Sequence, residues 1–160
     1  MLVFMRGGFW LPIPEQGLFA PMPLTYTIIP ELHLVYVRYW GVANIGESMQ
    51  VFAQYASDPD FRADQKHLID LKDVVEYERS FPELIKLQAE KADTLMQSKT
   101  PNLMVYYAPN RNSHSMARTI LKSWDGLGAT VGLIAQTEHQ ALSMLGLGVQ
   151  SFAELPMRSA

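Results

Sequence analysis

Short apolar runs alternate along most of the chain with longer segments in which apolar residues recur at helical spacing. Residues 24–29 and 32–40 are rich in β-branched and aromatic side chains, and Pro30 and Glu31 separate them. This pattern predicts two strands joined by a tight turn. Three more short apolar runs predict strands at residues 67–71, 103–108 and 130–135.

Four segments show the i, i+4, i+7 spacing of an amphipathic helix. They lie at residues 44–57, 80–96, 116–124 and 137–147. Asn44 is the expected N-cap of the first, with Glu47 three residues later. Ser80 and Glu83 have the spacing of a capping box at the start of the second.

The same spacing predicts which side of each helix faces the core. The expected inward positions are, in chain order, Ile45, Met49, Phe52, Ala53 and Ala56; Leu84, Ile85, Ala89, Ala92 and Met96; Met116, Ala117, Ile120, Leu121 and Trp124; and Ala141, Leu142 and Leu145. The element order ββαβαβαβα predicts an α/β fold, in which a mixed, largely parallel five-stranded sheet carries four helices and begins with an antiparallel pair.

Residues 1–23 differ from the rest, because they hold four of the ten prolines and three of the ten glycines. Such a stretch sustains no long helix or strand. One interpretation is an extended arm that covers an apolar surface with Phe9, Trp10, Leu11 and Phe19. The others are a poorly ordered segment or a translation start at Met22. A single domain is then expected over residues 24–155, with a tail at 156–160.

The composition is that of one globular domain: 160 residues, 48% hydrophobic and 18% charged. The absence of cysteine excludes thiol catalysis, thiolate metal sites and disulfides, and it favours a reducing, cytoplasmic location. A net charge of −3 argues against binding to nucleic acid. No uncharged apolar stretch approaches 18 residues, so no membrane span is expected.

Charge is distributed unevenly. Residues 58–93 hold ten acidic and six basic residues, whereas residues 99–122 hold Lys99, Arg111, Arg118 and Lys122 and no acid. Segments of opposite charge favour self-association or a protein partner. Solvated helix faces are the alternative interpretation.

Two short motifs carry a family resemblance. Residues 67–74, HLIDLKDV, resemble the end of a central strand in STAS domains, the anti-sigma-factor-antagonist-like family. Residues 58–61, DPDF, resemble the turn of its SpoIIAA-like branch. In this comparison Ser80 falls where the family has a phosphorylatable serine at a helix start, although Phe81 stands where the family has glycine.

The resemblance implies a non-catalytic protein-interaction or regulatory domain that uses no cofactor. The expected interaction surface is the loop from Asp73 to Ser80 and the helix that follows it. Ser80 serves there as cap and as phosphorylation switch, since a helix N-terminus favours a phosphate. The candidate site residues are Asp70, Asp73, Glu78, Arg79 and Ser80.

A second hypothesis is a module that binds a small apolar ligand or a lipid, because lipid-binding domains of the Sec14 type have a related core. It rests on the supply of large apolar side chains at Met104, Tyr106, Tyr107, Met116 and Trp124. An apolar cavity of several hundred cubic ångströms favours this hypothesis. A filled core with an exposed helix at Ser80 favours the interaction domain.

Other groups of polar residues and glycines predict no metal, catalytic or phosphate-binding site. The four histidines, His33, His67, His114 and His139, lack the spacing of metal ligands, so no metal site is expected. Residues 113–115 and Asp125 contain the residue types of a catalytic triad but no nucleophile elbow. Gly126, Gly128 and Gly132 follow a helix and precede a strand, the reverse of a phosphate-binding loop, and are expected to end that helix.

Overall fold

The computed structural model describes residues 2–5, 9–12 and 23–157. In the N-terminal segment, β1 (Leu2–Met5) and β2 (Phe9–Pro12) pair as an antiparallel hairpin. Each strand has only four residues, in keeping with the proline and glycine content. The expected packing of Phe9, Trp10, Leu11 and Phe19, and the start at Met22, lie outside the described side chains.

The α/β prediction is confirmed. Five strands form one sheet in the order of their sequence: β3 (Leu24–Ile29), β4 (Leu34–Ala43), β5 (Lys66–Tyr77), β6 (Asn102–Tyr107) and β7 (Thr130–Ala135). Only the β3–β4 pair of this sheet is antiparallel, and a 3-10 turn, η1 (Pro30–Leu32), joins these two strands. The helices are α2 (Ile45–Ala56), α3 (Phe81–Leu95), α4 (Arg111–Ser123) and α5 (Glu138–Met144).

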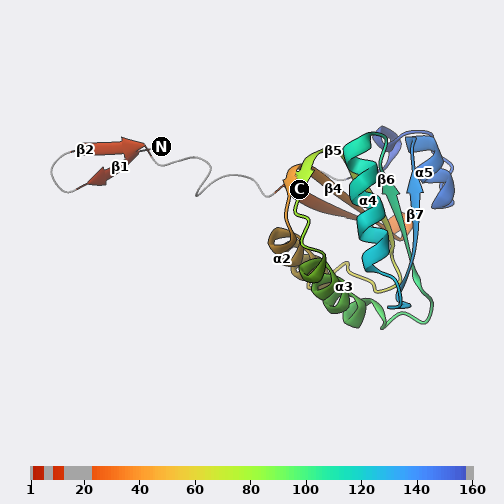
Figure 1. Ribbon diagram of the computed structural model, residues 1–160. Coiled ribbons are helices and arrows are strands. Elements are labelled where there is room, and N and C mark those ends of the chain that lie inside the picture. Colours follow the sequence, from red (N-terminus) through yellow and green to blue (C-terminus); the bar gives the residue numbers. More distant parts are fainter. Residues whose placement is uncertain (1, 6–8, 13–22, 158–160) are drawn as a thin grey trace.

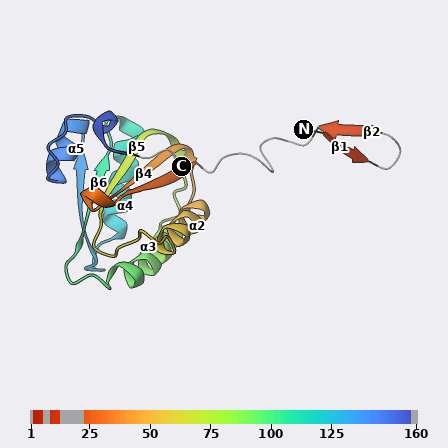
Figure 2. The same cartoon turned by 180° about the vertical axis from the view of Figure 1, so that it is seen from behind.

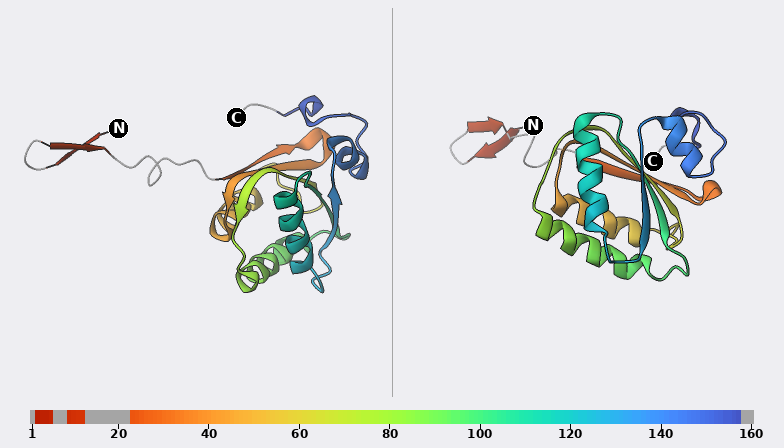
Figure 3. Two further views of the ribbon diagram at one scale, coloured as in Figure 1. Left: turned by 45° about the horizontal axis from the view of Figure 1, so that its top comes forward. Right: turned by 45° about the vertical axis from the view of Figure 1, so that its right-hand side comes forward.

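Helices cover both faces of the sheet (Figures 1 and 2). Figure 3 shows α2, α3 and α4 on one face, and α5 with the short turn η2 (Phe152–Glu154) on the other. Neighbouring residues of β5 point to opposite faces, as the pleat requires: Ile69 belongs to the core under α2, α3 and α4, whereas Leu68 belongs to the core under α5. Most of the core lies on the α2–α4 side.

Strand β5 is longer than the sequence predicted. The expected end at Lys72 is wrong, because pairing with β4 continues to Tyr77 through two register shifts. One shift lies at Gly41, whose φ of 64° is a conformation that glycine adopts without strain. Asp73 therefore lies inside the strand, and only residues 78–80 connect β5 to α3.

The predicted inward faces are confirmed for α4 and α5 but are wrong in part for α2 and α3. The buried residues of α2 are Ile45, Ser48, Val51 and Tyr55, and those of α3 are Leu87, Gln88, Ala92 and Leu95. Two positions expected inside α3, Ile85 and Met96, are 42% and 62% exposed. The predicted faces consist of apolar residues alone, whereas the inner faces in the structure also carry the polar Ser48 and Gln88.

Of the two predicted helix caps, one is confirmed and one is wrong. Asn44 caps α2 as expected, since its Oδ1 accepts a hydrogen bond of 2.8 Å from the N–H of Glu47. The capping box predicted at α3 is wrong. Ser80 occupies the N-cap position, but its side chain makes no capping hydrogen bond, and Glu83 instead pairs with Lys86 at 3.2 Å.

Candidate functional site

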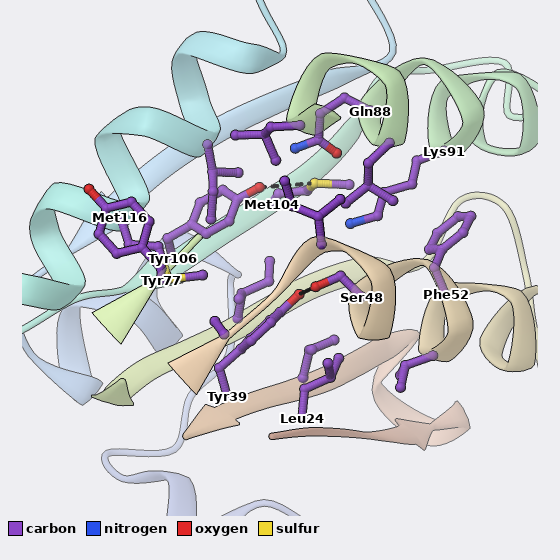
Figure 4. A pocket seen from close by; sticks show the side chains of 18 of the residues that line it. Leu24, Tyr39, Ser48, Phe52, Tyr77, Gln88, Lys91, Met104, Tyr106 and Met116 are labelled. Carbon is purple, nitrogen blue, oxygen red and sulfur yellow. Dashed lines mark hydrogen bonds between the residues drawn. The ribbon is translucent and has the colours of Figure 1, made fainter. Parts of the chain in front are cut away.

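An apolar cavity lies between the sheet and the layer formed by α2, α3 and α4 (Figure 4). Its volume is about 100 Å³. Most of the wall is apolar, with contributions from Leu24, Val51, Ile69, Leu87, Met104 and Ile120. Helix α3 packs against α2 and α4 rather than closely against a strand, and the space beneath it is only partly filled.

Several polar groups of the cavity wall already have a hydrogen-bond partner within the protein. The hydroxyls of Tyr39 and Ser48 are 3.1 Å apart and share a hydrogen bond. The indole N–H of Trp124 donates to the Tyr106 hydroxyl at 3.3 Å, and that hydroxyl donates to the sulfur of Met104 at 3.5 Å. Burial raises the pKa values of Tyr39 and Tyr106, so both remain neutral.

Two other polar groups of the wall are buried without a partner. Gln88 is 1% exposed; its Nε2 donates to Ser123 Oγ at 3.1 Å, but its Oε1 accepts no hydrogen bond from any described residue. His67 is 5% exposed, and its Nε2 has no partner within the same described part of the chain. Buried polar atoms are nearly always hydrogen-bonded, so two such atoms at one cavity indicate a place for another molecule.

Lys91 adds a positive charge to this wall. In Figure 4 its ammonium group points from α3 into the cavity, on the side of Ser48 and Phe52. The Nζ atom lies 5.5 Å from the centre of the Phe52 ring, a cation–π arrangement. Burial lowers the pKa of Lys91 to about 8. Burial, and then the charge of Lys91, lower the pKa of His67 to about 3, so His67 is neutral at neutral pH.

The opposite end of the cavity begins at Glu78. Its Oε2 accepts a hydrogen bond of 2.9 Å from the backbone N–H of Ile45, at the start of α2. Glu78 is the only one of the five sequence-predicted site residues to line the cavity.

The other four predicted residues do not gather at this cavity. Asp70 is 5% exposed and shares the α5 face of β5 with Leu68, where it accepts a hydrogen bond of 2.6 Å from the hydroxyl of Tyr36. Asp73 pairs with Arg38 at 3.0 Å. Each carboxylate is therefore held by a residue of β4.

Arg79 and Ser80 lie at the surface between β5 and α3. The guanidinium of Arg79 lies 4.4 Å from the centre of the Tyr77 ring and 3.4 Å from Glu76 Oε1. The Ser80 hydroxyl has no hydrogen-bond partner within residues 23–157. The predicted set of five is thus divided between strand β5, which holds Asp70 and Asp73, and the loop before α3, which holds the other three.

Sequence reasoning missed the residues that define the cavity. It treated His67 as isolated and assigned no role to Gln88 or Lys91. A signal was present, because Leu84, Leu87, Gln88 and Lys91 follow one another at i, i+3, i+4 and i+7 and so share one helix face. The apolar residues of a neighbouring face gave the stronger pattern.

Three basic residues of the segment 99–122 form a row on the surface of α4. Arg111, Arg118 and Lys122 are exposed on α4 at i, i+7 and i+11, so they lie along one side of the helix. Within the described ranges, none of the three makes an ion pair.

Comparison with known proteins assigns no family to the chain: no protein-family model matches it, and no curated protein matches its sequence. The resemblance to SpoIIAA-like STAS domains therefore stays a prediction. In the part of the chain that the structure describes, no helix combines the length and apolar character needed to cross a membrane. The same residues contain no group of three or more carboxylates and histidines placed to hold a metal ion.

Proposed function

We propose that this protein binds a small, largely apolar molecule in the cavity beneath α2, α3 and α4, without converting it chemically. The observation that carries the proposal is the pair of buried, unpartnered atoms, His67 Nε2 and Gln88 Oε1, in the wall of an otherwise apolar space. Leaving a buried polar group unsatisfied costs about 1–3 kcal/mol. A bound molecule that reaches either atom removes part of this cost.

The size of the cavity favours a small ligand over a lipid. The volume of about 100 Å³ is somewhat below the roughly 150 Å³ of an engineered cavity that holds benzene. Pockets for larger ligands measure about 300–1,000 Å³. The cavity is smaller than the several hundred cubic ångströms expected for the ligand-binding hypothesis, so we propose a small apolar ligand and no Sec14-type lipid.

The test is binding of neutral, ring-sized compounds such as benzyl alcohol and indole. Amide NMR shifts should change first for residues of the cavity wall, and the midpoint of thermal unfolding should rise with ligand concentration. Ile120→Phe places a larger side chain in the wall and should abolish both effects. Ile85→Phe changes the same residue type on the exposed side of α3 and should leave them intact.

A cavity that holds only water gives a different result. None of the compounds then shifts the amide signals of the wall, and Ile120→Phe and Ile85→Phe behave alike. That outcome overturns the proposal.

We also propose, as a second candidate, a protein-interaction surface at the loop before α3, controlled by Ser80. The observation that favours it is the free Ser80 hydroxyl, because phosphorylation there breaks no capping bond. A phosphate at this position faces the positive end of α3. If Ser80→Asp and the unchanged protein bind the same partners with equal affinity, this candidate is wrong.

A further inference from the structure

We infer that the ligand of this cavity carries a carboxylate or a similar anionic group, which the Lys91 ammonium binds. This inference rests on the proposed function and specifies the class of molecule: a small aromatic or branched acid with its ring against the apolar wall.

Lys91 has no counter-charge among the residues that the structure describes. It makes no hydrogen bond or ion pair with any residue of the described ranges, and its Nζ lies beside the Phe52 ring. Among the described residues, Glu78 is the only carboxylate in the cavity wall, and it is bonded to the start of α2. From Ser80, the N-cap, to Lys91, α3 advances about 16 Å, so Glu78 lies at the far end.

Lys91 is partly buried, and its ammonium group faces an apolar wall. A charge in such a place is unfavourable unless a partner compensates it. The lowered pKa of Lys91 has the same origin, since burial disfavours the charged form. An anion with an apolar body supplies the missing charge and fills the remaining space.

His67 and Gln88 add neutral polar groups beside Lys91 in the cavity wall. His67 is neutral at neutral pH, so it adds no second positive charge; in the tautomer protonated at Nε2 it donates to a carboxylate oxygen. Gln88 is held by its bond to Ser123, which leaves Oε1 as an acceptor for a hydroxyl or N–H of the ligand. Lys91 and Gln88 are neighbours on one face of α3.

The experiment compares three compounds of similar shape and different charge: benzoate, benzamide and benzylamine. Isothermal titration should give benzoate at least tenfold tighter binding than benzamide, and benzylamine the weakest binding. Lys91→Met should remove the preference for benzoate while benzamide still binds. Lys86→Met, on the exposed side of the same helix, should change neither affinity.

The outcomes separate the two proposals. If benzoate and benzamide bind the unchanged protein equally well, the anionic inference is wrong and the cavity remains a ligand site. If none of the three compounds binds, the proposed function fails and this inference fails with it.

A measurement on the unchanged protein covers the case in which Lys91→Met does not fold. An anion stabilises the charged form of Lys91, so the complex should take up a fraction of a proton when benzoate binds at pH 8.5. Isothermal titration in two buffers with different ionisation enthalpies measures this uptake. His67 from β5 is already neutral, and burial raises the pKa values of Tyr39, Tyr55 and Tyr106, so Lys91 is the group that responds. Binding without proton uptake contradicts the inference.

Discussion

Glu78 and Ile45, 33 residues apart in the sequence, are joined by a hydrogen bond of 2.9 Å from the Ile45 N–H to Glu78 Oε2. The first N–H groups of a helix have no partner within the helix, so Glu78 supplies one to α2. The backbone N–H of Glu78 also donates to the carbonyl of Ala43 at 2.9 Å. The connection from β5 to α3 is thus fixed to the start of α2, at one end of the cavity.

Glu78→Ala should destabilise the protein by about 1 kcal/mol, because it removes the acceptor of the Ile45 N–H. Urea unfolding gives the free energy. Glu90→Ala is the matched control, since Glu90 is exposed on α3 and makes no hydrogen bond or ion pair with any described residue. Equal losses in the two variants would show that the bond to Ile45 adds no stability.

Asn110→Ala should cost about 1 kcal/mol of unfolding free energy, whereas Ser80→Ala should change it by less than about 0.5 kcal/mol. Asn110 Oδ1 accepts a hydrogen bond of 3.0 Å from the N–H of Ser113, and Ser113 Oγ accepts one of 3.1 Å from Asn110. Ser80 makes no such bond. Chemical denaturation of both variants tests the contrast, and a large loss in Ser80→Ala would contradict it.

Gly132→Ala should destabilise the protein by about 1–3 kcal/mol. Gly132 was expected to help end a helix, but it lies within β7, where an added Cβ would overlap Leu121 Cδ2 of α4. The space at Gly148 is open, and its φ is ordinary, so Gly148→Ala should be neutral or slightly stabilising. Thermal unfolding of the two variants decides, and similar midpoints would rule out a close approach of α4 to β7.

His67 should make stability fall as the pH is lowered from about 6.5 to about 3. In the unfolded chain histidine takes up its proton near the ordinary pKa of 6.5, whereas burial delays this step in the folded protein to about pH 3. The unfolded state therefore binds more protons within this window, and stability decreases by up to about 1.4 kcal/mol per pH unit.

His67→Leu should flatten that dependence, measured by urea unfolding at pH 7, 6, 5 and 4. His139→Leu, on the exposed surface of α5, should retain it. The prediction is wrong if the two variants follow the same curve.

The local pattern of the sequence was sufficient for the elements and for part of the core. Strand β6 and the inner faces of α4 and α5 follow from apolar residues at strand or helix spacing, and the structure confirms them. Gly126 and Gly128 follow α4 with positive φ values of 80° and 68°, as expected of residues that end a helix. These features depend on neighbours a few residues away.

The cavity depended on contacts that local spacing does not encode. Ser48 and Gln88 lie on inner faces because Tyr39 and Ser123, from other elements, provide hydrogen bonds for them. His67 of β5 and Lys91 of α3 both line the cavity, although they are 24 residues apart in the sequence. The sequence by itself determined the strands, the helices and their order, since backbone periodicity is local. Only the tertiary structure decided which polar residues became buried, because their partners come from distant parts of the chain.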